Sequence, residues 1–412
     1  MAEPRRRTQP LEHNLLLTAT LCLLAFGAVM VFSATSAPNV LQGGDGTSYL
    51  VKYLVYGAVG LAVMQLMARH GLELARRFGP LLLVAGFVLM VLVHVPGIGV
   101  SVNGARRWIG VGPLTFQPSE VMKLAIVLYV AKMLAERPQR MRTVQTLISP
   151  TLLVVGAALL PVIATPDLGT TLIIGCTVAA MLLVAGAPLR VLGTLAGASA
   201  GLVTVVAFAV PYMRDRMTSF LDPWADAGGT GFQAVQGQIA LGSGGIFGVG
   251  PGQSVQKIFY LPEAHTDFIL AVIGEELGVI GVCALLSLYG LIAYAGLRTA
   301  KGARSQYERL LATGVTSLIV GQALLNVFAV LGIAPLTGEP LPFVSNGSTS
   351  ITVLLASMGL LLNIASRGAL TLRAVTPEPK SQGSRPHADR DRSGRNGGAR
   401  GARAGGRRRA AG

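Results

Sequence analysis

Three side chains that could transfer a proton stand at every second position: Glu263, His265 and Asp267. A long apolar run follows them, so Asp267 stands where a polar segment enters an apolar helix. Partial removal from water raises the pKa of a carboxylate and makes it a better general base. The alternative is that Thr266 and Asp267 cap the helix, as a lone aspartate at this place commonly does. The two titratable neighbours favour the chemical interpretation, but they are too few to predict a metal site.

Arg106 and Arg107 form a second candidate, because guanidinium groups bind phosphate through paired hydrogen bonds. The alternatives are contact with lipid headgroups or an ion pair with Asp167 or Asp222. Trp108 follows directly, and it could anchor the chain at the membrane surface or form a flat platform for a sugar or a prenyl chain. The segment therefore predicts either anion binding or anchoring.

The remaining charged candidates are one loop lysine and several charges inside apolar runs. Lys257 is either a further cation for a phosphate or a solvated loop lysine. Glu275 and Glu276 lie within an apolar helix, where carboxylates are costly and usually paired. Lys123 is the partner that we expect for them, and Glu120 can also pair with it because the two are three residues apart on a helix. A structural network of ion pairs is favoured here over a path for protons.

The composition predicts the scaffold that must position these residues. The chain has 412 residues, of which 51% are hydrophobic and 13% charged, and its mean hydropathy is +0.58. Soluble domains carry about 25% charged residues, so an ordinary soluble protein and a disordered one are both excluded. The apolar runs are continuous rather than alternating, which predicts an all-α polytopic membrane protein and not a β-barrel. Windows of about 20 apolar residues predict about ten transmembrane helices, near 14–33, 52–68, 79–96, 118–134, 147–165, 168–187, 191–211, 267–297, 310–334 and 350–366.

The charges of the short connections predict the orientation of these helices. Arginine and lysine clusters precede the first span and follow the second, fourth, sixth, eighth and tenth, so an even number of spans places them all on one side. The positive-inside rule makes that side the cytoplasm, with both termini inside. The other connections then face outward, including the long extracytoplasmic loop 212–266 before the eighth helix. Most of the unusual motifs lie in these outer loops, which predicts chemistry or binding at the extracytoplasmic face.

The positions of the predicted helices divide the chain into three segments. Residues 1–13 form a cytoplasmic N-terminal segment, 14–367 the transmembrane domain and 368–412 a tail. The tail carries 11 basic and 3 acidic residues, a large part of the net charge of +15. It is rich in Gly, Ala, Arg, Pro and Ser and cannot bury a core, so we expect it to be disordered. Contact with anionic lipids of the inner leaflet is the favoured role; docking of a partner or contact with DNA is the alternative, and no nucleic acid is expected as a partner of the folded part.

Four motifs, taken together, resemble those of a known family. They are NGARRWIGVGPLTFQPSE at 103–120, PDLGTT at 166–171, VQKIFYLPEAHTDFILAVIGEELG at 255–278 and PLPFVSNGSTS at 340–350. Their order and spacing resemble the SEDS family, the shape, elongation, division and sporulation proteins, over about residues 12–367. The third motif is more similar to the division branch than to the elongation branch, and the sporulation branch is close. The last motif departs from the usual PFISYGGSS, since Asn346 replaces an aromatic residue and Ser348 a glycine.

The resemblance implies a ten-helix fold with an outward-facing active site. It implies peptidoglycan glycosyltransferase activity on lipid II, the undecaprenyl-diphosphate-linked disaccharide pentapeptide. The essential acid of the family falls on Asp267, which would be the catalytic base, and the essential tryptophan falls on Trp108. The other functional positions of the family, which we assign to substrate binding together with Trp108, fall on Arg106, Arg107, Lys123, Lys257, Glu263 and His265.

The resemblance also implies partners and a location. We expect a class B penicillin-binding transpeptidase as the partner, with other divisome membrane proteins and membrane lipids, in the bacterial cytoplasmic membrane at the division septum. The sequence demands no cofactor, although a divalent cation such as Mg²⁺ could neutralise the leaving diphosphate. A lipid II flippase and a non-catalytic divisome scaffold stay open as alternatives, as do the elongation and sporulation roles. Charges inside the apolar runs permit the flippase, and the exposed tail and outer loops permit the scaffold.

Overall fold

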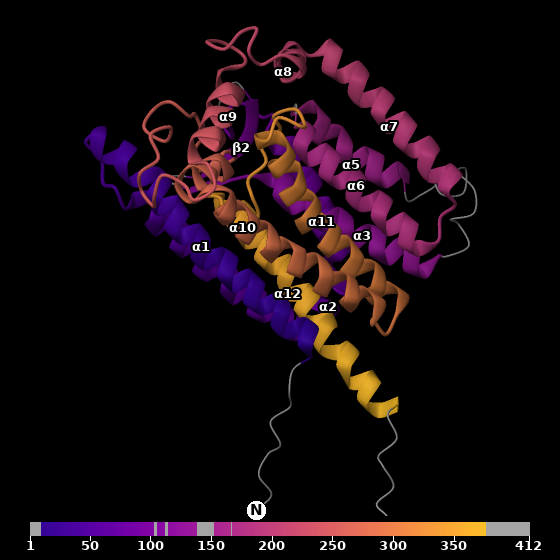
Figure 1. Cartoon of the computed structure of the whole chain (residues 1–412). Coiled ribbons are helices and arrows are strands. Elements are labelled where there is room, and N and C mark those ends of the chain that lie inside the picture. Colours follow the sequence, from indigo (N-terminus) through magenta and orange to yellow (C-terminus); the bar gives the residue numbers. More distant parts are fainter. Residues whose placement is uncertain (1–9, 103–104, 112–113, 138–151, 166, 376–412) are drawn as a thin grey trace, which may run out of the picture. The chain divides into compact units, whose positions relative to one another are not determined.

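The computed structural model describes residues 10–102, 105–111, 114–137, 152–165 and 167–375, and this part is mostly helical, as the sequence predicts (Figure 1). Its helices are α1 (Leu11–Leu41), α2 (Ser48–Leu92), α3 (Pro118–Glu136), α5 (Leu153–Ala164), α6 (Leu168–Ala185), α7 (Leu189–Ala209), α8 (Pro211–Leu221), α9 (Phe232–Gly244), α10 (Ile269–Lys301), α11 (Gln306–Val330) and α12 (Ser348–Val375). Within the described residues, 6 helices are long and apolar enough to cross a membrane, namely α1, α2, α6, α10, α11 and α12 up to Gly368. The number of ten spans stays a prediction.

The predicted spans 52–68 and 79–96 fall within the single helix α2. Four of its glycines lie close to other helices: a Cβ built on them would approach, in chain order, Leu355 at Gly60, Leu360 at Gly71, Leu128 at Gly79 and Met122 at Gly86. α3 and α12 begin side by side, because the Gln117 N–H donates to Thr349 Oγ1 at 3.1 Å. The first half of α2 therefore runs along α12 away from these starts, and the second half returns along α3. The two halves run in opposite directions, as two separate spans would, so the chain bends back within the residues assigned to α2.

α11 is the central helix of the bundle. It packs against α10, α6 and α3, while α1 packs on α10 and α2 on α3. Leu, Ile, Val, Met and Ala side chains fill the spaces between these helices. Because lipid tails are as apolar as this core, close packing and interhelical hydrogen bonds hold such a bundle together. Polar groups between the helices are costly in such a core, so their positions point to interhelical hydrogen bonds or to a functional site.

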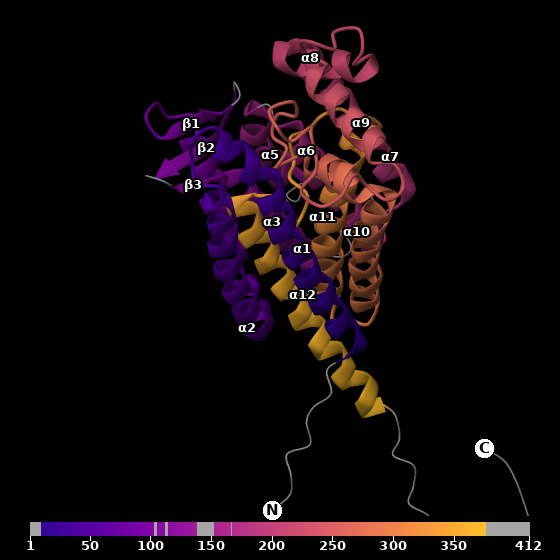
Figure 2. The same ribbon diagram turned by 60° about the vertical axis from the view of Figure 1, so that its left-hand side comes forward.

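Two segments that were predicted as outer loops contain regular structure. Part of 96–119 forms a three-stranded antiparallel sheet in the order β1-β2-β3. The strands are β1 (Gly99–Val102), β2 (Ala105–Val111) and β3 (Leu114–Phe116). The predicted loop 212–266 likewise contains α9 and most of α8. Figures 1 and 2 show the sheet, α8 and α9 at the same end of the bundle, which we call the loop end.

α10 contains a break at Gly278, where φ is 65° and ψ is −165°. Glycine adopts a positive φ without the steric cost that a Cβ would bring. The carbonyl of Glu276, freed by the break, accepts a hydrogen bond from the Gly250 N–H at 3.0 Å. In return, the Val279 N–H donates to the Gly245 carbonyl at 3.0 Å. The glycine-rich segment after α9 is therefore joined to α10 by backbone hydrogen bonds.

α12 continues to Val375, past the predicted border of the tail at 368. The contacts divide the chain into two units, Met1–Arg373 and Ala374–Gly412. Most of the predicted N-terminal segment, the start of the predicted span 147–165 and the tail from 376 onward lie outside the described residues.

Candidate active site

Asp267 lies at the loop end, just before α10 begins at Ile269. The N-cap of α10 is Phe268, and the helix has no side-chain cap hydrogen bond. The alternative in which Asp267 or Thr266 caps this helix is therefore wrong. The Asp267 side chain is half-buried, and its Oδ1 accepts a hydrogen bond from Thr266 Oγ1 at 3.2 Å. The carboxylate is thus left available for another role.

The surroundings of Asp267 suit a group that exchanges protons near neutral pH. Its pKa is raised to about 7, first by burial and then by the Glu263 carboxylate, against the lowering effect of the Arg216 guanidinium. Arg216 lies in α8, and its Nη1 donates to the Leu336 carbonyl at 2.8 Å. The sequence analysis missed Arg216, although a second pair of arginines in the predicted outer loop, Arg214 and Arg216, was a signal that could have found it. A perturbed carboxylate beside a cation is a common property of catalytic sites.

Glu263 and His265 shape the turn before the candidate base. Glu263 adopts a positive φ of 54°. The His265 ring packs edge-on against Tyr49 with 4.8 Å between the ring centroids, and burial lowers its pKa against the opposing effect of Glu263. The His265 carbonyl accepts from the Asn346 N–H at 3.0 Å. This contact uses the backbone of Asn346, so the unusual side chain at that position does not alter it.

The last outer loop lies directly beside Asp267. Asn326 Nδ2 in α11 donates to the carbonyl of Asp267 at 2.7 Å and to that of Glu339 at 2.8 Å. Gly338 has a φ of 73°, and a Cβ built on it would stand 3.9 Å from Asp267 Oδ2. Three more carbonyls of the loop accept from helix side chains: Pro340 from Gln322, Pro342 from Tyr289 and Phe343 from Tyr53. The loop is therefore held in place by α2, α10 and α11.

Lys123 lies in a buried cluster with this loop. Its Nζ stands 2.9 Å from Glu120 Oε1 and 3.0 Å from Glu339 Oε2. The predicted pair of Glu120 and Lys123 is therefore confirmed. The predicted pairing of Lys123 with Glu275 or Glu276 is wrong, because Glu339 occupies the place of the second carboxylate. Whether Lys123 also contacts a substrate stays a prediction.

Glu339 is a second residue that the sequence analysis missed. It is buried, and its Oε1 accepts from Thr170 Oγ1 at 2.7 Å, next to Asp167. The pKa of Glu339 is raised overall. Burial is the largest cause and the carboxylates of Asp167 and Glu120 add to it, whereas the Lys123 ammonium group opposes it. The signal in the sequence was a single carboxylate inside the otherwise uncharged run LTGEPLPF.

Lys257 lies in another buried cluster, between α1 and α10. Its Nζ stands 2.7 Å from Glu276 Oε1 and donates to Ser33 Oγ at 3.1 Å and to the Gly252 carbonyl at 2.8 Å. Lys257 is only 4% exposed, so the alternative of a solvated loop lysine is wrong. Glu276 is therefore in a buried ion pair, as expected for a carboxylate inside an apolar helix, but its partner is Lys257 and not the predicted Lys123. A contact between Lys257 and a substrate stays a prediction.

The two adjacent arginines lie on β2, where successive side chains point to opposite faces. Arg107 shares a face with the buried Ile109, and its Nε donates to the Thr165 carbonyl at 3.2 Å. Arg106 shares the other face with Trp108; Arg106 is exposed and Trp108 half-buried. This arrangement separates the two guanidinium groups and leaves Arg106 as the more accessible one.

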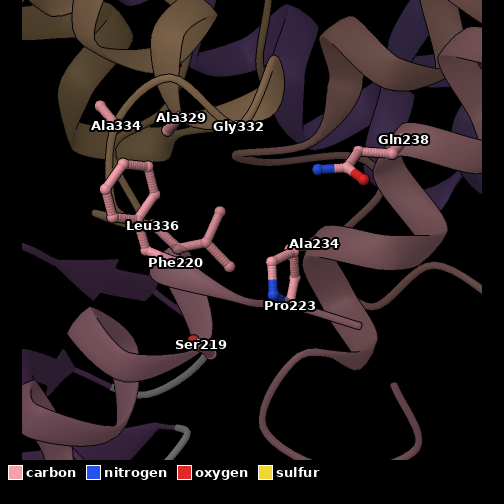
Figure 3. Close-up of a pocket in the computed structure, with 9 residues that line it drawn as sticks. All are labelled: Ser219, Phe220, Pro223, Ala234, Gln238, Ala329, Gly332, Ala334 and Leu336. Carbon is pink, nitrogen blue, oxygen red and sulfur yellow. The ribbon is translucent and has the colours of Figure 1, made fainter. Parts of the chain in front are cut away.

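A small cavity lies between α8, α9 and the segment that follows α11 (Figure 3). Its volume is about 10 Å³, and its lining includes Phe220, Gln238 and Leu336. That space holds about one water molecule, so this cavity does not accommodate a sugar. Among the described residues, no group of three or more His, Cys, Asp and Glu side chains is placed to hold a metal ion.

Comparison with known proteins finds relatives along most of the chain. The family model described as "Cell cycle protein", which covers FtsW, RodA and SpoVE, matches residues 13–369. The chain is similar to Stage V sporulation protein E of Bacillus subtilis (strain 168), with 41% identity over 362 residues, 87% of this chain and 98% of that protein. It is also similar to the probable peptidoglycan glycosyltransferase FtsW of Geobacter sp. (strain M18), with 37% identity over 363 residues, 88% of this chain and 98% of that protein.

Solved structures resemble the fold. One chain comes from a study of the structural coordination of polymerization and crosslinking by a peptidoglycan synthase complex. It matches with a TM-score of 0.71 and 30% identity, covering 86% of this chain and 97% of that chain. The crystal structure of the rod shape determining protein RodA of Thermus thermophilus matches with a TM-score of 0.63 and 29% identity, covering 88% of this chain and 98% of that chain.

Proposed function

The chain belongs to the family of FtsW, RodA and SpoVE, and from this membership we propose that it is a peptidoglycan glycosyltransferase that polymerises lipid II at the outer face of the cytoplasmic membrane. The placement of Asp267 carries the proposal. This carboxylate stands at the mouth of a membrane helix, does not cap it, and has a pKa raised to about 7. Asp267 can therefore accept a proton near neutral pH.

The reaction that suits this group is an in-line displacement at a sugar carbon. The acceptor hydroxyl is a poor nucleophile, and Asp267 takes its proton as the new C–O bond forms. The bond from the anomeric carbon to the diphosphate breaks, and the electron pair leaves with undecaprenyl diphosphate. Such a displacement inverts the anomeric centre.

The leaving diphosphate gains negative charge, and a cation near it would lower the barrier. We assign this contact to Arg106, because it is exposed on β2. Trp108 shares the face of Arg106 and is assigned to the sugar or prenyl part of the substrate. Arg107 is assigned mainly to holding the sheet against Thr165. Lys123 and Lys257 are assigned mainly to the frame, since each is paired with a buried carboxylate.

We further propose a role in septal wall synthesis, with a class B penicillin-binding transpeptidase as the partner. The division role is supported by relatives named FtsW and by the motif at 255–278, although a sporulation protein is also similar. The partner is supported by the similarity to a chain from a peptidoglycan synthase complex that coordinates polymerization and crosslinking. A division role also fits a multi-pass protein of the bacterial cytoplasmic membrane.

The proposal is tested by supplying labelled lipid II in detergent to the purified protein with its cognate transpeptidase, and separating the products on a gel. Asp267→Asn should reduce glycan formation about 10²- to 10⁴-fold, the usual contribution of a general base. Asp226→Asn is the matched control, because Asp226 is an exposed aspartate of the same outer segment. Equal glycan ladders from Asp267→Asn and the control variant would show that a residue other than Asp267 is the general base. Lipid II binding by the wild-type complex without any ladder would support a flippase or a scaffold instead.

A further inference from the structure

We infer that Asn326 is a positioning residue for Asp267, because one amide ties the carbonyl of Asp267 to the carbonyl of Glu339. This inference rests on the proposed function of Asp267 and adds to it. Asn326 does not touch the reacting atoms. It acts through the backbone on either side of the candidate base.

The geometry uses both hydrogens of the amide. Asn326 Nδ2 donates to the carbonyl of Asp267 at 2.7 Å and to that of Glu339 at 2.8 Å. A primary amide nitrogen has two N–H groups, so these two bonds use its full donor capacity. Asn326 is only 2% exposed, so little water can compete for these two hydrogen bonds. The tie therefore joins two parts of the chain at a defined separation.

The Asp267 backbone needs such a donor. The hydrogen bonds of α10 begin at the next carbonyl, since the Ala271 N–H donates to Phe268 at 2.9 Å. Asp267 therefore stands just outside the regular helix, and Asn326 supplies a donor to its carbonyl. A buried carbonyl without a donor costs free energy comparable to a lost hydrogen bond. Removing the amide would take the donor from the Asp267 carbonyl and break the link between Asp267 and the Glu339 backbone.

A second amide extends the tie along the same face of α11. Gln322 lies four residues before Asn326, and side chains with this spacing share one face of a helix. Gln322 Nε2 donates to the Pro340 carbonyl at 2.9 Å, and its Oε1 accepts from Lys123 Nζ at 3.0 Å. The loop beside Asp267 is thus fixed by two amides and, through Lys123, by the buried carboxylates. This frame can hold the base where the acceptor hydroxyl arrives.

The expected effect is on the chemical step. A displacement of about 1 Å in a catalytic group can cost on the order of 10²-fold in rate. We therefore expect Asn326→Ala to lower the kcat of lipid II polymerisation by about 10²-fold and to leave KM nearly unchanged. Gly338 of this loop lies close to Asp267, since a Cβ built on it would stand 3.9 Å from Asp267 Oδ2 and 3.8 Å from Arg216 Nη1. The charges of Glu263 and Arg216 both act on this carboxylate. Loss of the Asn326 link would loosen the packing of this loop on Asp267, make the carboxylate more accessible to water and move the acidic limb of the pH profile to lower pH.

Asn363→Ala is the matched control. Asn363 is also 2% exposed and also donates its Nδ2 to a carbonyl of another element, that of Ala68 in α2, at 2.7 Å. It lies in α12, and among the described residues its amide donates to α2 rather than to the Asp267 loop. Both alanine variants should lower the unfolding temperature in detergent. Only Asn326→Ala should lower kcat and shift the pH profile.

Equal kcat values and unshifted pH profiles for the two alanine variants would overturn the inference, because the role of Asn326 would then be purely structural. If Asn326→Ala does not fold, the pair Asn326→Leu and Asn363→Leu, which fills the lost volume, answers the same question. A wild-type complex that makes no glycan at all would refute the proposed function instead. A wild type that makes glycan beside an equally active Asn326→Leu refutes only the inference.

Discussion

Lys257 of the long outer segment and Glu276 of α10 form an ion pair of 2.7 Å in which both side chains are buried. Ser33 of α1 donates to the same carboxylate at 2.6 Å. The cluster therefore connects an outer loop to two membrane helices. Because its charges are shielded from water, the loss of one partner leaves the other without compensation.

Lys257→Met should strongly destabilise the fold. Breaking a buried ion pair from one side typically costs about 3–5 kcal/mol. The thermal unfolding temperature in detergent would fall, and Lys257→Met combined with Glu276→Leu should recover much of the loss because no lone charge remains. Lys301→Met, at an exposed lysine near the end of the same helix, is the control. Equal stability of Lys257→Met and Lys301→Met would show that the pair is not maintained in solution.

Glycan polymerisation should depend on pH through Asp267. A general base must be ionised, and the pKa of Asp267 is raised to about 7. The initial rate should therefore fall about tenfold per pH unit below that value and level off above it. Arg216→Gln removes the cation that lowers this pKa, so its acidic limb should lie at higher pH. A rate that is flat through the neutral range, or a limb that Arg216→Gln leaves in place, would contradict the assignment.

The same raised pKa predicts a gain in stability when the charge is removed. The ordinary pKa of an aspartate is about 4, and the folded state holds the Asp267 proton up to about 7. The resulting stabilisation is complete below the lower value and is lost as the pH rises through the upper one. Asp267→Asn should therefore unfold at a higher temperature than the wild type above neutral pH, with a smaller difference in acid. Unfolding temperatures measured across this range check the sign.

Replacing each of the two arginines of β2 by alanine should affect a different property, substrate binding for Arg106 and stability for Arg107. Arg106→Ala should raise the KM for lipid II roughly tenfold, equivalent to about 1.4 kcal/mol of binding, with little change in stability. Arg107→Ala loses the hydrogen bond to the Thr165 carbonyl. That variant should instead lower the unfolding temperature, since a hydrogen bond from a charged group is worth about 1.5–3 kcal/mol. Kinetics and thermal melts on both variants decide the assignment, and identical profiles would refute the division of roles.

Local features of the site could be predicted from the sequence. The polar cluster before an apolar run correctly placed Asp267 at the mouth of a helix, because the change in composition is visible along the chain. The spacing of Glu120 and Lys123 predicted a pair that the structure contains. Both features depend on neighbours in sequence, where the helical period is enough.

The partners that are distant in sequence could not be predicted in the same way. Lys257 was free to pair with several carboxylates, and only the packing of α1 on α10 makes Glu276 its partner. Asn326 and Glu339 gave little signal, because an amide in an apolar helix and a carboxylate in a loop have many ordinary roles. Their meaning comes from the neighbouring backbone of Asp267, and that neighbourhood depends on which helices lie side by side.

The helical connection between the two halves of α2 has a consequence for mapping the topology of this protein with proteases. Proteases cleave extended backbone, and a helical segment offers them none. Arg69, Arg76 and Arg77 would be trypsin sites in an ordinary connection, but all three lie inside α2, where the two passes meet without a loop. Resistance to trypsin at these arginines would reflect the helical backbone rather than a location on the protected side of the membrane.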